Sequence, residues 1–259
     1  EEPVVASLEE ETPAPVAETS IAKIGDEKFA TVAAAVEYAK NNNIKDLVIT
    51  LIGETTAESA TAMEDSFNLI YSTAFDSVTI KQEDSTKPYY IDTIYTGDRT
   101  ATDGKFVFDG VNLVITSQIW FECDVELINN SIIKRTNDVK NFIYYGDVYI
   151  EQGSQFISQI DDIYGGSITV DGGKTDGTYS EVPGFHSIYF DVRNNQVFNV
   201  VNGAYALFNA VNEIGRITLD GVMNVTDSKV SVFNNIAMGA NSSLNIDTES
   251  ELTAKVITG

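Results

Sequence analysis

Residues 22–54 read AKIGDEKFATVAAAVEYAKNNNIKDLVITLIGE, and this stretch contains the clearest helix pattern of the chain. Thr31 is a favourable N-cap residue, and the three asparagines at residues 41–43 are typical of a helix end. Between them, apolar residues recur at the spacing of one helical face: Val32, Val36 and Ala39. The pattern predicts an amphipathic helix over residues 31–41.

The residues after this helix alternate in the manner of a β-strand, from Asp46 through Leu47, Ile49 and Leu51. The rest of the chain repeats one pattern, which is a short alternating apolar run, a turn at Asn, Asp or Gly, and a second run. The repeats occupy residues 77–84, 105–115, 124–133, 147–157, 166–173, 186–195, 215–226 and 242–253. Each repeat is therefore expected to be a pair of strands bent at a polar residue.

The spacing of these repeats indicates how the strands are arranged. Intervals of 19, 23, 20 and 20 residues separate the first inward apolar residues, which are Phe106, Val125, Val148, Ile168 and Ile188. The spacing then lengthens to 29 residues at Ile217 and 27 at Leu244. A degenerate period near 20 is typical of a solenoid, whereas a β-sandwich has closer strands and tight two-residue turns. The sequence predicts an all-β, right-handed parallel β-helix.

This fold explains why a helix precedes the strands. A parallel β-helix ends in an open apolar cross-section, and the amphipathic helix is well placed to cap the N-terminal end. We expect three regions: an acidic Pro/Glu-rich linker over residues 1–20, a lead-in strand and capping helix over 21–45, and the β-helix over 46–259. Because no comparable helix follows Thr253, we expect the β-helix to continue beyond the fragment or to be covered by another chain.

Composition excludes several classes of partner. The chain has 259 residues and a formal net charge of −23, with 16 basic and 39 acidic residues. Such a surface repels nucleic acid and anionic lipid, because both are bound through clustered Lys and Arg. No apolar run is long enough to span a bilayer, so no membrane insertion is expected. The single cysteine, Cys123, is expected to fill the core.

The lead-in segment resembles a known family. The residues that carry the resemblance are Phe29-Ala30-Thr31-Val32, the small helix residues Ala35 and Ala39, and the strand over residues 46–51. Over residues 24–56 the chain resembles pectin-lyase-like right-handed β-helix domains of exported cell-surface proteins from Gram-positive, gut-type bacteria. The resemblance implies an extracellular or cell-wall-associated location and a role in adhesion or glycan contact. An export signal missing upstream of Glu1 is expected for the same reason.

Enzymes of that family cut acidic polysaccharides, and Asp161 and Asp162 superficially match their paired aspartates. The supporting motifs are absent, since the only histidine, His186, stands in GFHSIYF. Basic residues that a lyase would need are isolated from acidic clusters along the sequence: Lys134, Arg135, Arg193 and Arg216. A structural role for the two aspartates, in a turn between strands, is the alternative.

The segment over residues 171–184, DGGKTDGTYSEVPG, is the most loop-like part of the repeat region. Asp171, Asp176 and Glu181 are its candidate metal ligands, because Ca²⁺ favours several oxygen ligands in a flexible loop. Their spacing matches neither an EF-hand nor a GGxGxD repeat, so an excursion without metal is the alternative. No other cofactor is expected.

Aromatic residues recur through the repeats. Adjacent rings such as Tyr144 and Tyr145 must point to opposite sides of an extended segment, so one of them faces outward. We expect outward rings to form a ligand-binding ladder that suits sugars or a protein partner: Tyr144, Tyr145, Tyr164, Trp120 and Tyr179. Core filling is the alternative for these residues.

The predicted function is therefore a non-catalytic extracellular module, either a structural stalk or an adhesin. Its partner would be a host or environmental glycan or a surface protein. A polysaccharide lyase or glycoside hydrolase of the pectin-lyase-like group is the alternative, and a trimeric fibre is a third hypothesis.

Overall fold

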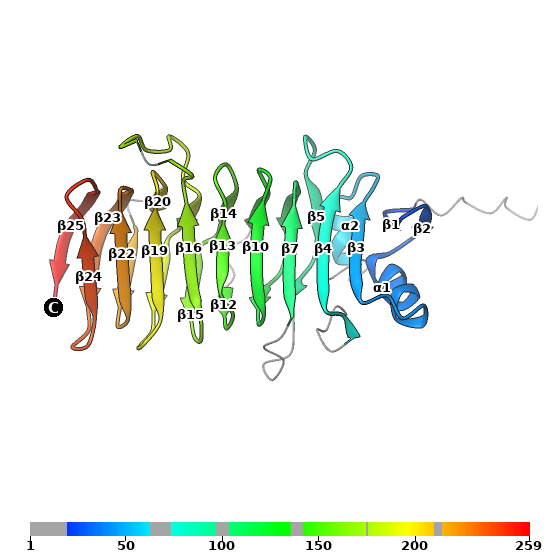
Figure 1. Ribbon diagram of the computed structural model, residues 1–259, viewed down its shortest axis with the longest axis horizontal. Coiled ribbons are helices and arrows are strands. Elements are labelled where there is room, and N and C mark those ends of the chain that lie inside the picture. Colours follow the sequence, from blue (N-terminus) through cyan, green and yellow to red (C-terminus); the bar gives the residue numbers. More distant parts are fainter. Residues whose placement is uncertain (1–19, 63–73, 97–103, 136–141, 175, 210–213) are drawn as a thin grey trace, which may run out of the picture.

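The computed structural model describes residues 20–62, 74–96, 104–135, 142–174, 176–209 and 214–259, and β-strands dominate them (Figure 1). The predicted linker over residues 1–20 lies outside the described residues except for Ser20. Two helices are described, α1 (Val32–Asn41) and α2 (Ala57–Ala62). The prediction of a mostly β chain with an early helix is confirmed, and the short helix α2 was not predicted.

The first sheet has eleven strands and runs the length of the molecule (Figure 1). Its strands, in spatial order, are β2 (Glu27–Phe29), β1 (Ala22–Ile24), β3 (Asp46–Leu51), β4 (Ser77–Gln82), β7 (Lys105–Asp109), β10 (Asp124–Ile128), β13 (Val148–Ile150), β16 (Ser167–Asp171), β19 (Val197–Val201), β22 (Val222–Thr226) and β24 (Ser243–Ile246). From β3 onward, neighbouring strands pair in parallel, whereas β1 pairs antiparallel with both β2 and β3.

The second sheet has fourteen strands and two arms. One arm, here called the second face, comprises β5 (Tyr89–Ile91), β8 (Asn112–Ile115), β11 (Ile132–Arg135), β14 (Gln155–Ile157), β17 (Phe185–Ser187) and β20 (Tyr205–Phe208). The other arm, the third face, comprises β6 (Ile94–Tyr95), β9 (Ile119–Phe121), β12 (Phe142–Tyr144), β15 (Ile160–Ile163), β18 (Tyr189–Val192) and β21 (Arg216–Leu219). The long strand β23 (Lys229–Met238) joins the arms, and β25 (Glu251–Thr258) pairs with it.

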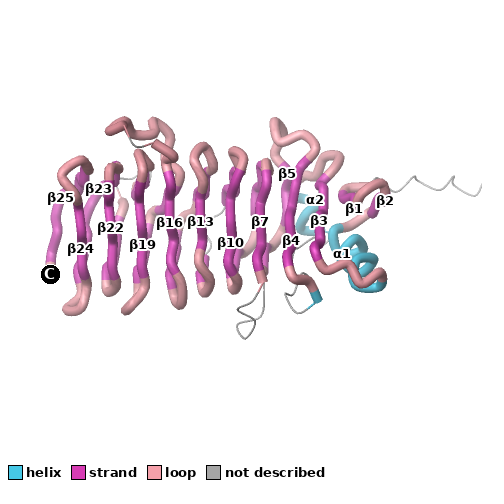
Figure 2. The backbone as a smooth tube through the Cα atoms, in the orientation of Figure 1, coloured by secondary structure: helices cyan, strands magenta, loops and turns pink. Residues whose placement is uncertain are grey.

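The chain visits the three faces in turn, so that β7, β8 and β9 are followed by β10, β11 and β12 on the same faces. Each such set of three strands is here called a round. Every round pairs in parallel with the preceding round on all three faces. Figure 2 shows the strands of the first sheet lying side by side along the molecule. Long parallel sheets of this kind leave the chain with few local contacts and many contacts between rounds.

The interior of the rounds is a column of apolar side chains. One register column of the first sheet is buried along its length and consists of Leu47, Val78, Phe106, Val125, Val148, Ile168, Phe198 and Met223. In later rounds, the ring centroid of Phe185 lies at most 6.0 Å from the ring centroids of four other phenylalanines: Phe156, Phe190, Phe198 and Phe208. These rings come from all three faces, so aromatic packing ties the faces to one another.

The corners between the first sheet and the second face explain the polar turns of the sequence. Left-handed backbone conformations occur there at Gly110, Asn130, Gly153, Asn202 and Gly203. Asn and Gly tolerate a positive φ better than most other residues, which is why they recur at these corners. Buried serines lie at the same corner in successive rounds and are linked by hydrogen bonds. For example, Ser131 N donates to Ser154 Oγ at 3.0 Å.

Two details of the predicted repeat are wrong. Each round has three strands rather than two, because a short third strand follows the bent pair. In addition, Ile188 and Ile217 do not continue the column of Ile168, whose next members are Phe198 and Met223. Residues 172–184 form an excursion between β16 and β17, which shifts the later repeats along the sequence.

Helix α1 forms as the sequence predicts. Ala34 N donates to Thr31 Oγ1 at 3.0 Å, which confirms the N-cap, and Asn43 adopts a left-handed conformation just after the helix. The buried residues of the helix are Val32, Ala35, Val36 and Ala39. They join the core beside β1, β2 and β3, and Figure 1 shows α1 at the end of the first sheet.

Cys123 belongs to the core, as predicted, and is 3% exposed. Its Sγ donates to the Thr96 carbonyl at 3.1 Å. Burial raises the pKa of the Cys123 thiol to about 11, so the nucleophilic thiolate is suppressed. Among the described residues, neither helix has the length and apolar character needed to cross a bilayer.

We predict that Phe185→Ala lowers the free energy of unfolding by about 3–5 kcal/mol, because it leaves a cavity among four phenylalanine rings. Urea unfolding followed by circular dichroism measures the change. Val182→Ala is the control, since Val182 is 56% exposed and its truncation should cost under about 0.5 kcal/mol. Equal losses in the two variants would contradict the shared aromatic core.

Candidate functional site

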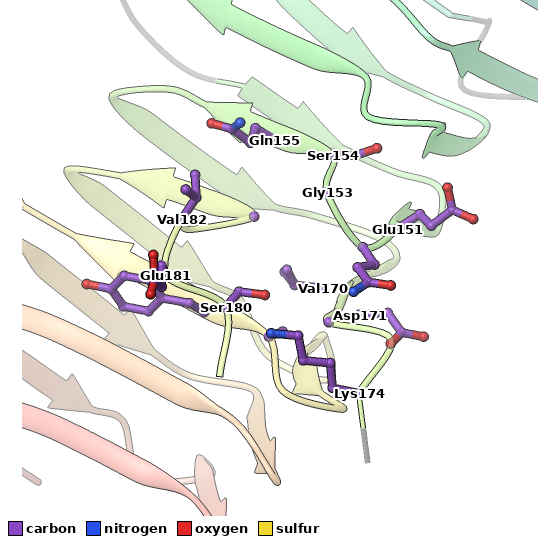
Figure 3. Close-up of a pocket in the computed structure, with 15 residues that line it drawn as sticks. Glu151, Gly153, Ser154, Gln155, Val170, Asp171, Lys174, Ser180, Glu181 and Val182 are labelled. Atoms are coloured by element: carbon purple, nitrogen blue, oxygen red, sulfur yellow. The ribbon is translucent and has the colours of Figure 1, made fainter. Parts of the chain in front are cut away.

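A pocket of about 300 Å³ lies where residues 172–184 leave the regular rounds (Figure 3). Its floor and walls come from the corners of the neighbouring rounds and from the excursion itself. The lining includes Glu151, Gln155, Val170, Asp171, Lys174, Ser180, Glu181, Val182 and Tyr205. The pocket thus combines carboxylates, an ammonium, an amide and a hydroxyl with two valines and a tyrosine.

Hydrogen bonds fix the first half of the excursion. Asp171 Oδ1 accepts from Gly173 N at 2.8 Å and from Asn202 Nδ2 at 3.1 Å, and its Oδ2 accepts from Tyr149 Oη at 3.0 Å. Burial and this bond to Asp171 raise the pKa of Tyr149 to about 12, so the phenol stays protonated. Asp176 Oδ1 accepts from Thr178 Oγ1 at 2.6 Å, which lowers the pKa of Asp176.

The second half is attached to the neighbouring round. Ser180 N donates to Gly203 O at 2.7 Å, and Gly184 N donates to Tyr205 O at 2.9 Å. Gly203 has a φ of +76°, and a Cβ there would lie 2.4 Å from the Thr178 carbonyl oxygen. Only glycine allows the excursion to approach the corner so closely.

The structure places the three predicted metal ligands in different surroundings. Asp171 and Asp176 are engaged by the hydrogen bonds above, and Glu181 is exposed on the pocket rim. Within the part of the chain that the structure describes, no three His, Cys, Asp or Glu side chains are grouped closely enough to hold a metal ion. Hydrogen bonds within the loop and to the neighbouring rounds hold it in place.

Asp161 and Asp162 are adjacent in β15 and therefore point to opposite sides of the strand. Asp161 is 1% exposed and accepts a hydrogen bond from Ser158 Oγ inside the rounds. The buried Arg135 interacts with Asp161 electrostatically, although burial lowers the pKa of the guanidinium. The two carboxylates do not face one substrate together, as a catalytic pair would have to.

Asp162 is bound by an arginine from the next round. Arg193 Nε and Nη2 donate to Asp162 Oδ1 and Oδ2, each at 2.7 Å. This bidentate bond raises the pKa of Arg193. The side chain of Asp162 is 7% exposed and that of Arg193 is 47% exposed. The sequence analysis treated Arg193 as isolated from acidic residues, and the parallel register corrects this prediction.

The same corner contains two of the predicted ligand-binding tyrosines. The rings of Tyr145 and Tyr164 are stacked at 5.6 Å, and Arg193 Cζ lies 3.8 Å from the centroid of the Tyr164 ring. Two of the five predicted rings therefore stack on one another. Tyr145 covers one face of the Tyr164 ring and Arg193 covers the other, so neither face of Tyr164 is open to a ligand.

The other predicted aromatic residues lie elsewhere. Trp120 packs against Tyr95 on the third face, with ring centroids 5.7 Å apart. Tyr144 ends β12, and its side chain lies outside the described part of the structure. Tyr179 belongs to the excursion, and its hydroxyl donates to the Glu249 carbonyl. Trp120 and Tyr179 therefore lie apart from the Tyr145–Tyr164 stack.

One more carboxylate lies beside the Asp162–Arg193 pair. Asp191 is the register partner of Asp162 on the next round, and its Oδ1 is buried without a hydrogen-bond partner among the described residues. His186 lies on the second face instead, with its Nε2 at 2.9 Å from Asn209 Oδ1. Asp191 and Tyr205 were not predicted, because only the register of the rounds brings them next to the candidate residues, and Lys174 was not predicted although it lies within the loop considered for metal binding.

We predict energetic coupling between Arg193 and Asp162 in a double-mutant cycle. Arg193→Leu leaves the carboxylate of Asp162 without its cation, and solvent around the half-exposed arginine limits the cost to about 1–2 kcal/mol of unfolding free energy. Adding Asp162→Leu should recover about 1 kcal/mol of that loss. Urea unfolding of the four proteins measures the cycle, and additive effects would contradict a direct pair.

Comparison with known proteins found no family model, no curated protein and no solved structure that matches this chain.

Proposed function

We propose that this chain is a right-handed parallel β-helix module of an exported cell-surface protein, and that it binds a glycan without cutting it. The pocket under residues 172–184 is the binding site. The rounds act as a rigid stalk that carries the pocket, and α1 covers the apolar end of the stalk. The location outside the cell and the bacterial origin rest on the resemblance of residues 24–56.

The observation that carries the proposal is the pocket itself. Most rounds turn from the first sheet to the second face within a few residues, whereas residues 172–184 make a longer connection there and line a pocket of about 300 Å³. That volume is at the lower end of the range for small-molecule sites, and it suits one or two sugar residues. A protein partner would instead require about 800 Å² of contact surface on each side.

The chemistry of the lining also suits a sugar. Gln155, Ser180 and Glu181 provide an amide, a hydroxyl and a carboxylate for hydrogen bonds with hydroxyl groups. Val170, Val182 and Tyr205 provide an apolar surface for the C–H faces of a pyranose ring. Polar groups that fix orientation, set around a small apolar surface, are typical of a ligand site.

We predict that the chain binds a glycan saturably and that Val182→Trp weakens this binding at least tenfold, because the indole fills the pocket from its rim. A glycan array followed by titration calorimetry measures the effect. Val48→Trp is the matched control, since Val48 is another exposed valine, 42% accessible, on the outer side of the first sheet. Binding that both variants retain, or no binding to any glycan, would contradict the proposal.

A glycoside hydrolase is the second candidate, and it rests on Asp191. This residue places a second carboxylate in register with Asp162, and one of its oxygens has no hydrogen-bond partner among the described residues. Against catalysis, both oxygens of Asp162 are already bound by Arg193. Release of reducing sugar from a polysaccharide panel that Asp191→Asn abolishes would replace the binding proposal.

A further inference from the structure

Lys174 is the one basic side chain among the described residues that line the pocket. Its Nζ makes no ion pair with a described residue, and its recorded hydrogen-bond acceptor is the Tyr179 carbonyl at 3.5 Å. In Figure 3 the side chain of Lys174 extends inward from the excursion, with its ammonium on the side of Ser180. A half-buried ammonium with such a long bond retains donors for a ligand.

The position of Lys174 is fixed by the backbone. Lys174 N donates to Asn202 O at 2.8 Å. Its stem lies against the left-handed Gly203, where an added Cβ would meet Lys174 Cβ at 2.9 Å and Cδ at 3.4 Å. The aliphatic part of the Lys174 side chain is therefore already held in place. Less conformational entropy is lost when a ligand orders the ammonium.

Two of the carboxylates in the lining are already engaged. Asp171 accepts three hydrogen bonds, from Gly173, Asn202 and Tyr149. Glu151 Oε2 accepts from Asn129 N at 2.7 Å, and Figure 3 shows the carboxylate pointing away from the pocket. Neither residue neutralises Lys174 by direct contact.

We infer that the pocket selects a sugar residue that carries a carboxylate, and that this carboxylate binds Lys174 and the hydroxyl of Ser180. The inference rests on the glycan-binding function proposed above. The ring would pack on Val170, Val182 and Tyr205, with its hydroxyl groups toward Gln155. Because the protein has a formal charge of −23, one acidic residue in an otherwise neutral glycan is favoured over a polyuronate.

Titrations followed by NMR chemical shifts test the inference with matched methyl glycosides. The probes are the glucuronide and galacturonide, the corresponding neutral glucoside and galactoside, and the glucosaminide. We expect an acidic sugar to bind at least tenfold more tightly than its neutral counterpart. Lys174→Met should remove this preference while it keeps the stem against Gly203, and Lys174→Arg should retain most of it. Lys87→Met, a distant exposed lysine, is the control.

The outcomes separate the two proposals. If neutral sugars bind in the pocket and Lys174→Met changes nothing, the inference is wrong and the glycan-binding function stands. A preference for the glucosaminide would also overturn it, because the carboxylates would then be the recognising groups. If none of the probes binds and the glycan array is also empty, both proposals fail.

Discussion

The structure depends on the in-register stacking of one round on the next. A strand such as β10 obtains its backbone hydrogen bonds from β7 and β13, which belong to other rounds, and its inward side chains pack in the same columns. No round has a closed core of its own, because the side chains that meet inside its three short strands are covered above and below only by the neighbouring rounds. Parallel pairing also repeats the side-chain pattern of one round in the next. This explains why phenylalanines, serines and asparagines recur in columns such as Asn199, Asn224 and Asn245.

The candidate site lies where a long connection between β16 and β17 projects from the stack, while both strands stay paired with the adjacent rounds. Most corners are short, because each left-handed Gly or Asn lets the chain turn within a few residues. Residues 172–184 instead leave the stack and return at Gly184, whose N–H bonds to Tyr205 O of the next round. The regular rounds on either side hold both ends of the excursion. A loop that projects from stacked strands can vary without disturbing the core, and loops of this kind often carry recognition.

The features that depend on a few neighbouring residues could be predicted from the sequence. The cap at Thr31, the apolar face of the helix, the alternation in β3 and the polar corners follow from residue preference and periodicity over a few positions. Third strands such as Ile94–Tyr95 were missed, because such runs are too short to show alternation, whereas those over residues 189–192 and 216–219 lie within the predicted repeats. The excursion displaced the later repeats and hid their true register. Asp162 and Arg193 lie 31 residues apart, and Asp191 faces Asp162 only through the pairing of β15 with β18. Such long-range neighbours follow from register, which local sequence does not specify.

Cysteine cross-linking of register partners tests the central claim most directly. In a Cys123→Ser background, Asn199→Cys with Asn224→Cys joins partners in adjacent strands, whereas Asn199→Cys with Asn245→Cys joins residues two strands apart. Strands lie about 4.8 Å apart, so a short bifunctional thiol reagent should link the first pair rapidly and the second pair slowly or not at all. Selective linkage of Asn199 to Asn224, with native circular dichroism in both variants, is the predicted result. Equal linkage of the two pairs, or linkage of the distant pair alone, would contradict the stacking of rounds on which the fold and the site depend.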